Sequence, residues 1–324
     1  MSELLSPQAA SIVSTGLEVS HLVESFFQNK SPGTVKAYQQ DLKSFEKFVG
    51  ASSVQEAARK LLGSGYGAAN LLALQFKNHL REKKLSPASI NRKLAALRSL
   101  VKLGRVVGLV SFALEVDGLE VQALRDTRGP GADGVQKILK RAELQTDKKG
   151  KRDYAMLRLL FDLALRRAEV CSIDIEHINL EQGKLFALGK GRHQRQWLTL
   201  PEETQEAINS WMKERGEAPG PLLLALDPRS YGKRLGVDGV YQVVKKVGES
   251  VGVRVRPHGL RHAAITEALD ATGGDLRQVQ RFSRHKSYDM LMIYDDARGD
   301  FQGNVAKLVA KSTRAKVHRP ESAT

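Results

Sequence analysis

Pro257-His258-Gly259-Leu260-Arg261-His262 is the segment around which the interpretation of the whole 324-residue chain is built. His258 and Arg261 lie three residues apart and therefore share one face of a helical turn. His285 and Tyr294 follow further along, among the arginines Arg254, Arg256, Arg277, Arg281 and Arg284. Cationic and proton-transferring side chains gathered around one phenol indicate chemistry on a phosphate group.

Length and composition are those of a two-domain globular protein. Hydrophobic residues make up 41% and charged residues 27% of the 324 residues, enough for a sizeable core. No apolar run approaches the roughly 18 residues that a membrane helix needs, and Met1 to Thr15 lacks the pattern of a secretory signal. The single cysteine, Cys171, excludes an internal disulfide framework and fits a reducing compartment. We therefore expect a cytoplasmic protein without membrane contact.

Positive charge is the first indication of a partner. Lysines and arginines number 51 against 36 aspartates and glutamates, a formal net charge of +15. Residues 30–105 hold 15 of the basic and 4 of the acidic residues, an excess of 11. Such a region suits a polyanion, because neutralised phosphates release counterions. This favours nucleic acid over a basic surface that merely faces water, and we expect the protein to be nucleoid-associated.

Residues 17–114 are expected to form a four-helix domain. Ser31-Pro32 and Ser86-Pro87 are helix starts, each a capping serine followed by proline at the first helical position. The two helices that they open carry basic side chains around an apolar stripe. The candidate DNA-binding residues among them are Lys36, Lys43, Arg92, Lys93 and Arg98. The alternative is an ordinary bundle with a cationic surface.

The pattern changes at residues 115–134, where acidic residues and Arg128-Gly129-Pro130-Gly131 indicate a linker. Residues 135–315 are expected to form a second, mostly helical domain with a tail. Its opening helices are predicted over 133–144, 151–165 and 167–173, and an amphipathic tail helix over 304–311. Strands are predicted over 177–180, 184–188 and 196–200, with Gly189-Lys190-Gly191 turning the last two into a hairpin. The expected fold class is mainly α (α+β), with one small antiparallel sheet.

Together the motifs resemble those of the tyrosine site-specific recombinases, the phage integrase family. Ala164-Leu165-Arg166-Arg167-Ala168-Glu169-Val170 resembles the family's first arginine motif, and Gly189-Lys190-Gly191 resembles its hairpin lysine motif. Residues 258–262 resemble its H-x-L-R-H box, and His285 with Tyr294 resembles its closing histidine and nucleophile. Residues 17–114 resemble the core-binding domain of the family. Each motif alone is common, but their order and spacing together are specific.

The resemblance implies a catalytic set of Arg166, Lys190, His258, Arg261, His285 and Tyr294. Two guanidiniums can hold the non-bridging oxygens of a phosphodiester, because they stay cationic at any working pH. The phenol would attack phosphorus to give a covalent 3′-phosphotyrosine, with histidines handling the proton and the transition state. The lysine would protonate the leaving oxygen, and Glu169 would support the site. No metal and no cofactor is expected.

The resemblance also implies partners: double-stranded DNA with specific recombination sites, and a homotetramer that exchanges strands through a Holliday junction. Accessory proteins are left open. The alternatives are a nicking–closing enzyme like type IB topoisomerases and a catalytically silent DNA-binding regulator. The pair His258 and His262 could suggest zinc, but no glutamate follows His258 and no third ligand is evident.

Three positions depart from the family pattern without removing a catalytic side chain. Ala164 stands where the family usually has glycine, and Arg167 replaces a residue that is usually small or apolar. Ser283-Arg284-His285 stands where leucine-glycine-histidine is common.

Overall fold

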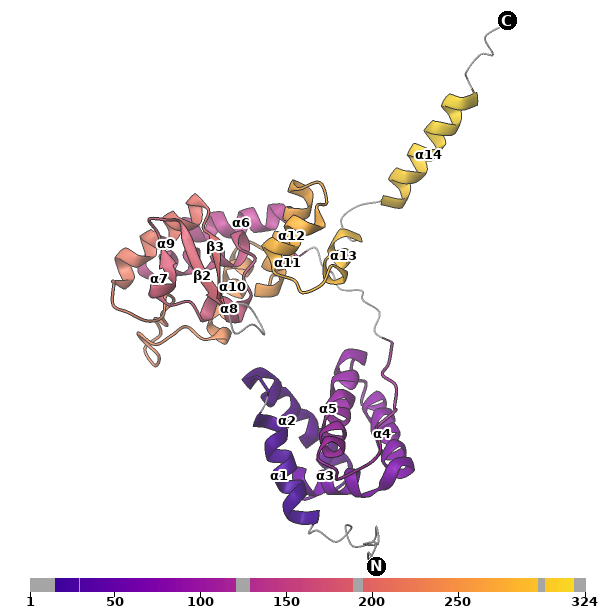
Figure 1. Ribbon diagram of the computed structural model, residues 1–324. Helices are drawn as coiled ribbons and strands as arrows, with labels where there is room; N and C mark the ends of the chain where they lie inside the picture. Colours follow the sequence, from indigo (N-terminus) through magenta and orange to yellow (C-terminus); the bar gives the residue numbers. More distant parts are fainter. Residues whose placement is uncertain (1–14, 29, 121–128, 189–194, 297–300, 318–324) are drawn as a thin grey trace, which may run out of the picture. The chain divides into compact units, whose positions relative to one another are not determined.

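The computed structural model describes residues 15–28, 30–120, 129–188, 195–296 and 301–317 (Figure 1). The chain divides into two compact units, Met1–Leu124 (unit 1) and Arg125–Thr324 (unit 2), each with its own hydrophobic core. Among the described residues, no helix combines the length and the apolar character needed to cross a membrane. Helices dominate both units, which confirms the predicted mainly α fold class.

Unit 1 is a helical bundle in which local capping sets two of the helix starts. The Ser31 hydroxyl accepts a hydrogen bond from the Thr34 backbone N–H at 3.4 Å, and Ser86 accepts one from Ser89 at 3.4 Å. A proline follows each serine as the first helical residue, so both predicted starts are confirmed. The helices are α1 (Thr15–Gln28), α2 (Pro32–Phe48), α3 (Val54–Gly63), α4 (Gly65–Glu82) and α5 (Pro87–Val106).

In the described part of unit 1 five helices are present where four were expected, because the sequence did not single out one of them. This helix, α3, contributes fully buried Leu61 beside the buried aromatic rings of Phe45 and Phe76, whose centroids lie 5.2 Å apart. Gly65 adopts a φ of 76°, which lets the chain turn straight from α3 into α4. For that reason α4 begins at Gly65 and not at Ala69, the residue predicted from the apolar spacing.

Unit 2 combines helices with one small sheet. Its elements are α6 (Gly131–Glu143), α7 (Lys148–Asp162), α8 (Arg167–Cys171), η2 (Ile175–His177), β1 (Ile178–Asn179), β2 (Lys184–Leu188), β3 (Arg195–Thr199), α9 (Glu202–Arg215), α10 (Val237–Ser250), α11 (Pro257–Ala271), α12 (Leu276–Ser283), α13 (Asp289–Asp296) and α14 (Phe301–Val317). Since α6 begins at Gly131, its first turn falls inside the segment expected to be a linker.

The sheet and the helices of unit 2 enclose one main core and one smaller cluster. The strands pair antiparallel in the order β1-β2-β3, with buried Leu185 opposite Leu198, which confirms the predicted sheet. Trp211 is fully buried in the main core and donates its indole N–H to the Leu222 carbonyl at 2.8 Å. Helices α11, α12 and α13 pack together at one end of the unit (Figure 1). The smaller cluster lies among these helices and includes Tyr294.

One helix ends earlier than the sequence predicts, and the difference shapes the site. The apolar pattern predicts helix over 151–165, but α7 ends at Asp162 and Ala164 adopts a φ of 44°. The Ala164 carbonyl accepts hydrogen bonds from Arg261 and Arg284, which come from far along the chain. These tertiary bonds hold a non-helical turn that local periodicity does not reveal.

Candidate active site

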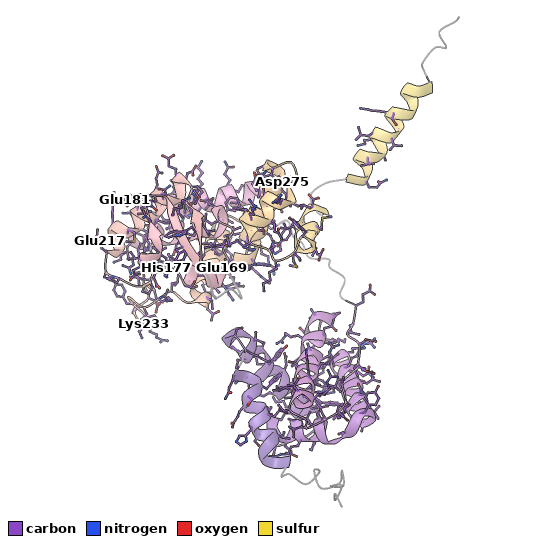
Figure 2. All side chains as sticks on the ribbon, in the orientation of Figure 1. Glu169, His177, Glu181, Glu217, Lys233 and Asp275 are labelled. Atoms are coloured by element: carbon purple, nitrogen blue, oxygen red, sulfur yellow. The ribbon has the colours of Figure 1, made fainter. Side chains whose placement is uncertain are left out.

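Arg166 and Glu169 form the first part of the site at the start of α8. Arg166 has an extended backbone and caps the helix, and Glu169, which is labelled in Figure 2, lies in its first turn. The Glu169 carboxylate accepts hydrogen bonds from the Arg166 backbone N–H at 2.9 Å and from Arg166 Nη1 at 2.7 Å. Since the Glu169 side chain is only 5% exposed, it fixes Arg166 from the protein interior.

Arg284 shares the same carboxylate from the opposite end of the domain sequence. Its Nη2 lies 3.1 Å from Glu169 Oε2, and both side chains are 5% exposed. Burial by itself would raise the pKa of Glu169, but Arg284 and Arg166 together hold that pKa below its ordinary value. Glu169 is therefore an ionised bridge between two guanidiniums at neutral pH.

Arg261 supplies another fixed guanidinium, from the second turn of α11. Its side chain is 1% exposed and donates from Nη1 to the Ala164 carbonyl and from Nη2 to the Ser283 carbonyl at 2.5 Å. The same Nη2 lies 3.4 Å from His285 Nε2. The predicted pair of arginines thus meets around one turn, between residues 163 and 166.

The hydrogen bonds of His285 define which of its nitrogens carries the proton. A guanidinium can only donate, so His285 Nε2 is the acceptor facing Arg261. The proton then sits on Nδ1, which lies 3.0 Å from the Ser283 hydroxyl. Burial, followed by the positive charges of Arg261 and Arg166, lowers the pKa of His285 to about 4. The ring is consequently neutral at pH 7.

Burial also affects the most enclosed guanidinium. It lowers the pKa of Arg261 to about 10, with added contributions from the neighbouring charges of Arg166 and Arg284. Arg261 still carries its charge at pH 7. The site therefore offers a concentrated positive field that an anionic group could neutralise.

Tyr294, on α13, is 4% exposed and lies beside two imidazole rings. Its ring centroid lies 4.9 Å from that of His262 and 5.9 Å from that of His285. His262 in turn meets exposed His258 edge to face, at 4.1 Å. The structure thus places His262 against both the candidate nucleophile and the candidate proton acceptor.

Five of the six predicted catalytic residues are connected by these contacts: Arg166, His258, Arg261, His285 and Tyr294. Lys190, with its Gly-Lys-Gly turn, lies outside the described residues; the strands on either side of it are paired. The contacts bring the side chains together, and the roles assigned to them remain predictions.

The predicted DNA-binding residues of unit 1 fall into two groups. Lys36 and Lys43 are exposed on α2. The other three are engaged within the unit: Arg92 and Lys93 bind the buried Asp41 carboxylate at 2.8 Å and 3.2 Å, and Arg98 donates to the Val116 carbonyl at 3.3 Å. Of these three, Arg92 keeps 43% of its side chain exposed and Lys93 only 12%.

A cavity of about 540 Å³ opens beside the site in unit 2. Its lining residues are polar or cationic: Gln196, Gln280, Arg281, Arg284, His285 and Lys286. A lining of this kind suits an anion. Within the part of the chain that the structure describes, no group of three histidine, cysteine, aspartate or glutamate side chains is arranged to hold a metal ion.

Sequence reasoning missed three contributors to the site. His262 was weighed only as half of a zinc pair, although it belongs to the hexapeptide and contacts Tyr294. Ser283 was noted only as a departure from a family pattern, and Arg284 only as such a departure and as one of five nearby arginines. Their positions beside a predicted catalytic histidine were the signal that could have found them.

Comparison with known proteins extends the likeness over most of the chain. The sequence model of the phage integrase family matches residues 131–299, and that of the phage integrase N-terminal SAM-like domain matches residues 25–103. A tyrosine recombinase of Synechococcus elongatus is 42% identical over 87% of this chain and 90% of its own length. One of Synechocystis is 37% identical over 91% of this chain and 96% of its own.

A solved structure shows the same fold. XerH site-specific recombinase bound to a palindromic difH substrate, in a post-cleavage complex, superposes with a TM-score of 0.66 at 17% identity. The match covers 90% of this chain and 85% of that one.

Proposed function

The chain belongs to the phage integrase family of tyrosine recombinases, enzymes that cleave and rejoin DNA, and on this basis we propose that it recombines specific sites through a covalent 3′-phosphotyrosine. The observation that carries the proposal is the chain of contacts in unit 2. It runs from Arg166 through Glu169 to Arg284, and from Arg261 through His285 to Tyr294. These contacts support a single site in which the arginines act on the phosphate that Tyr294 attacks.

In the cleavage step, the Tyr294 oxygen bonds to the scissile phosphorus while the bond from phosphorus to the 5′ oxygen breaks. Arg166 and Arg261 hold the non-bridging oxygens, whose negative charge increases in the pentacoordinate transition state. Their prior fixation by Glu169 and by backbone carbonyls supports this role, because donors already in place need no reorganisation during the reaction.

Two proton transfers accompany the cleavage step. The phenolic proton of Tyr294 passes to His258, and the departing 5′ oxygen takes a proton from Lys190. In the transition state His285 would donate to a phosphate oxygen from Nδ1, the nitrogen that carries its proton, in place of its contact with the Ser283 hydroxyl. The phosphotyrosine bond retains the energy of the broken phosphodiester, so a 5′ hydroxyl from a second strand can reverse the step and rejoin DNA.

Unit 1 would bind the duplex through α2 and α5. Exposed Lys36 and Lys43 on α2 are the best-placed phosphate contacts, since Lys93 already neutralises Asp41. Positive charge of this kind contributes affinity that falls with salt and carries little sequence information. We expect Lys36→Ala with Lys43→Ala to weaken binding of all duplexes and to reduce the salt dependence.

A nicked duplex tests the catalytic assignment. Duplexes selected by the protein from a randomised library would define a binding site, and a nick close to the cleavage position would let the short released strand diffuse away. We expect a covalent adduct that resists detergent, with a free 5′ hydroxyl on the released strand that polynucleotide kinase can label. Tyr294→Phe should bind the same duplex and form no adduct.

Three other outcomes would contradict the proposal, and each would favour a different interpretation. An adduct that persists in Tyr294→Phe would show that another residue is the nucleophile. No adduct with the wild-type protein, despite tight binding of the selected duplex, would favour a DNA-binding regulator. Relaxation of supercoiled plasmids that lack the selected site would favour a nicking–closing enzyme.

Strand exchange through a Holliday junction needs several protomers, and we propose that α14 joins them into a tetramer. The helix exposes Val305, Leu308 and Val309, which at this spacing share one face. An apolar face of this kind suits burial against a neighbouring protomer.

The tail can be tested separately from DNA binding. Truncation before Phe301, or replacement of Val305, Leu308 and Val309 by serine, should leave binding of a single site intact. It should abolish assembly of two sites into one complex, measured by sedimentation or native electrophoresis. Unchanged assembly of two sites would refute the role of α14.

A further inference from the structure

Arg284 adopts a backbone conformation that is costly for its residue type. It ends α12 with φ 60° and ψ 33°, in the left-handed region where a Cβ is unfavourable and glycine is preferred. Its backbone N–H closes the helix on the Gln280 carbonyl at 2.8 Å. The cost of an arginine here must be offset by what its side chain does.

The side chain turns inward, and each of its two terminal nitrogens donates two hydrogen bonds. Nη1 donates to the Leu163 carbonyl at 3.0 Å and to the Phe282 carbonyl at 3.1 Å. Nη2 donates to the Ala164 carbonyl at 3.1 Å and to Glu169 Oε2 at 3.1 Å. With 5% of the side chain exposed, this is a built internal network and not a surface contact.

The partners of Arg284 are the groups that orient the two candidate phosphate-binding arginines. Glu169 binds the Arg166 side chain and its backbone N–H. The Ala164 carbonyl accepts a second hydrogen bond, from Arg261. Ala164 also has a left-handed backbone, at φ 44°, so the turn before Arg166 needs external support.

We propose that Arg284 is a positioning residue that fixes the turn between residues 163 and 166 and thereby aligns Arg166 and Arg261 for the phosphate. The proposal rests on the function proposed above. Arg284 acts through Glu169 and the Ala164 carbonyl and not, in this role, on the DNA itself. Its charge also contributes to the lowered pKa of Arg261, as expected for guanidiniums held close together.

Two substitutions at Arg284 separate alignment from general stability. Arg284→Gly removes the guanidinium while making the left-handed backbone easier to adopt. Arg284→Lys keeps a charge that can still donate to Glu169. Adduct formation on saturating nicked duplex should fall on the order of 10²-fold in Arg284→Gly, the usual scale for misplaced reacting groups. Arg284→Lys should recover part of that loss.

Arg281→Met is the matched control, because Arg281 is an exposed arginine in the wall of the same cavity. We expect it to weaken duplex affinity more than it slows adduct formation at saturation. Arg284→Gly should show the opposite division, with affinity changed by no more than a few fold. A wild-type rate at saturation in Arg284→Gly, or a loss confined to affinity, would overturn the proposal.

A second measurement does not depend on activity. Arg284→Gly and Glu169→Gln should each lower the thermal unfolding midpoint, and the double variant should lower it by less than the sum, because both remove one shared ion pair. Additive shifts would overturn the proposed coupling even if adduct forms. If the wild-type protein forms no adduct but the shifts in unfolding midpoint are non-additive, the proposed function is refuted. The proposed coupling of Arg284 to Glu169 is then still supported.

Discussion

Replacement of Glu169 by glutamine should destabilise unit 2 strongly, because it removes the one carboxylate between two guanidiniums. Glu169 and Arg284 are each 5% exposed at a separation of 3.1 Å. Removal of one partner from a buried ion pair leaves an uncompensated charge and costs about 3–5 kcal/mol. The pair with Arg166 adds little, because that side chain is 26% exposed and screened pairs contribute about 0–1 kcal/mol. We therefore expect a loss of about 3 kcal/mol.

The loss should depend on pH in a defined direction. The folded-state pKa of Glu169 lies below its ordinary 4.5, so its stabilising charge is fully present above pH 4.5. That contribution disappears as pH falls through the folded-state pKa. The difference in free energy of unfolding between wild type and Glu169→Gln should therefore be constant near neutrality and shrink in acid.

Tryptophan fluorescence during urea titration measures this domain selectively. Both tryptophans of the sequence, Trp197 and Trp211, belong to unit 2, so unfolding of unit 1 contributes no tryptophan signal. Trp211 is fully buried and should respond to loss of the core. The linear dependence of free energy on urea then gives the change for this unit alone.

The control for this experiment is Glu203→Gln, which removes a surface ion pair. Glu203 is 64% exposed and lies 3.6 Å from Arg158, so its loss should cost less than about 1 kcal/mol. Ordinary surface substitutions change the free energy of unfolding by no more than about 0.5 kcal/mol. If Glu169→Gln lowers the free energy of unfolding by no more than this, the reasoning from burial is wrong.

Three further predictions test other parts of the molecule, one of them with a comparison variant. Because the pKa of His285 is lowered to about 4, the unfolded chain binds a proton more readily, and the stability of unit 2 should fall as pH drops from 6.5 toward 4. The slope contributed by this group approaches about 1.4 kcal/mol per pH unit, and His285→Gln should remove it in urea titrations across that range. A Cβ at Gly129 would lie 2.3 Å from the Gly259 carbonyl at the start of α11, so Gly129→Ala should lower the unfolding midpoint and slow adduct formation. Gly131→Ala, with a similar φ and nothing within 4 Å, should lose only the smaller cost of backbone strain. In unit 1, Asp41→Asn leaves Lys93 without its buried partner, so the circular dichroism transition should shift to lower urea while the tryptophan transition of unit 2 stays unchanged.

The sequence by itself indicated most of the helices and strands, α3 excepted, and the candidate catalytic residues. Serine followed by proline predicts the starts of α2 and α5, because a hydroxyl cap and a fixed φ act within a few residues. Apolar spacing and a glycine turn likewise predict the pairing of β2 with β3. All six catalytic candidates were named from motif order, and the five that the structure describes meet in unit 2. These signals involve residues close together in the chain, so they can be recognised from the sequence alone.

Only the tertiary structure decided how that site is held. The bond from Arg284 to the Leu163 carbonyl spans 121 residues, and the bond from Arg261 to the Ala164 carbonyl spans 97. No periodicity encodes such pairs. For that reason the helix predicted from the sequence ran on past the end of α7, through the turn that these bonds stabilise. In the sequence Arg284 stands out only as a departure from a motif and one of several arginines. The structure shows that it is an ion-pair partner of Glu169. The sequence therefore defines which side chains take part, whereas burial and long-range hydrogen bonds define their charge state and alignment.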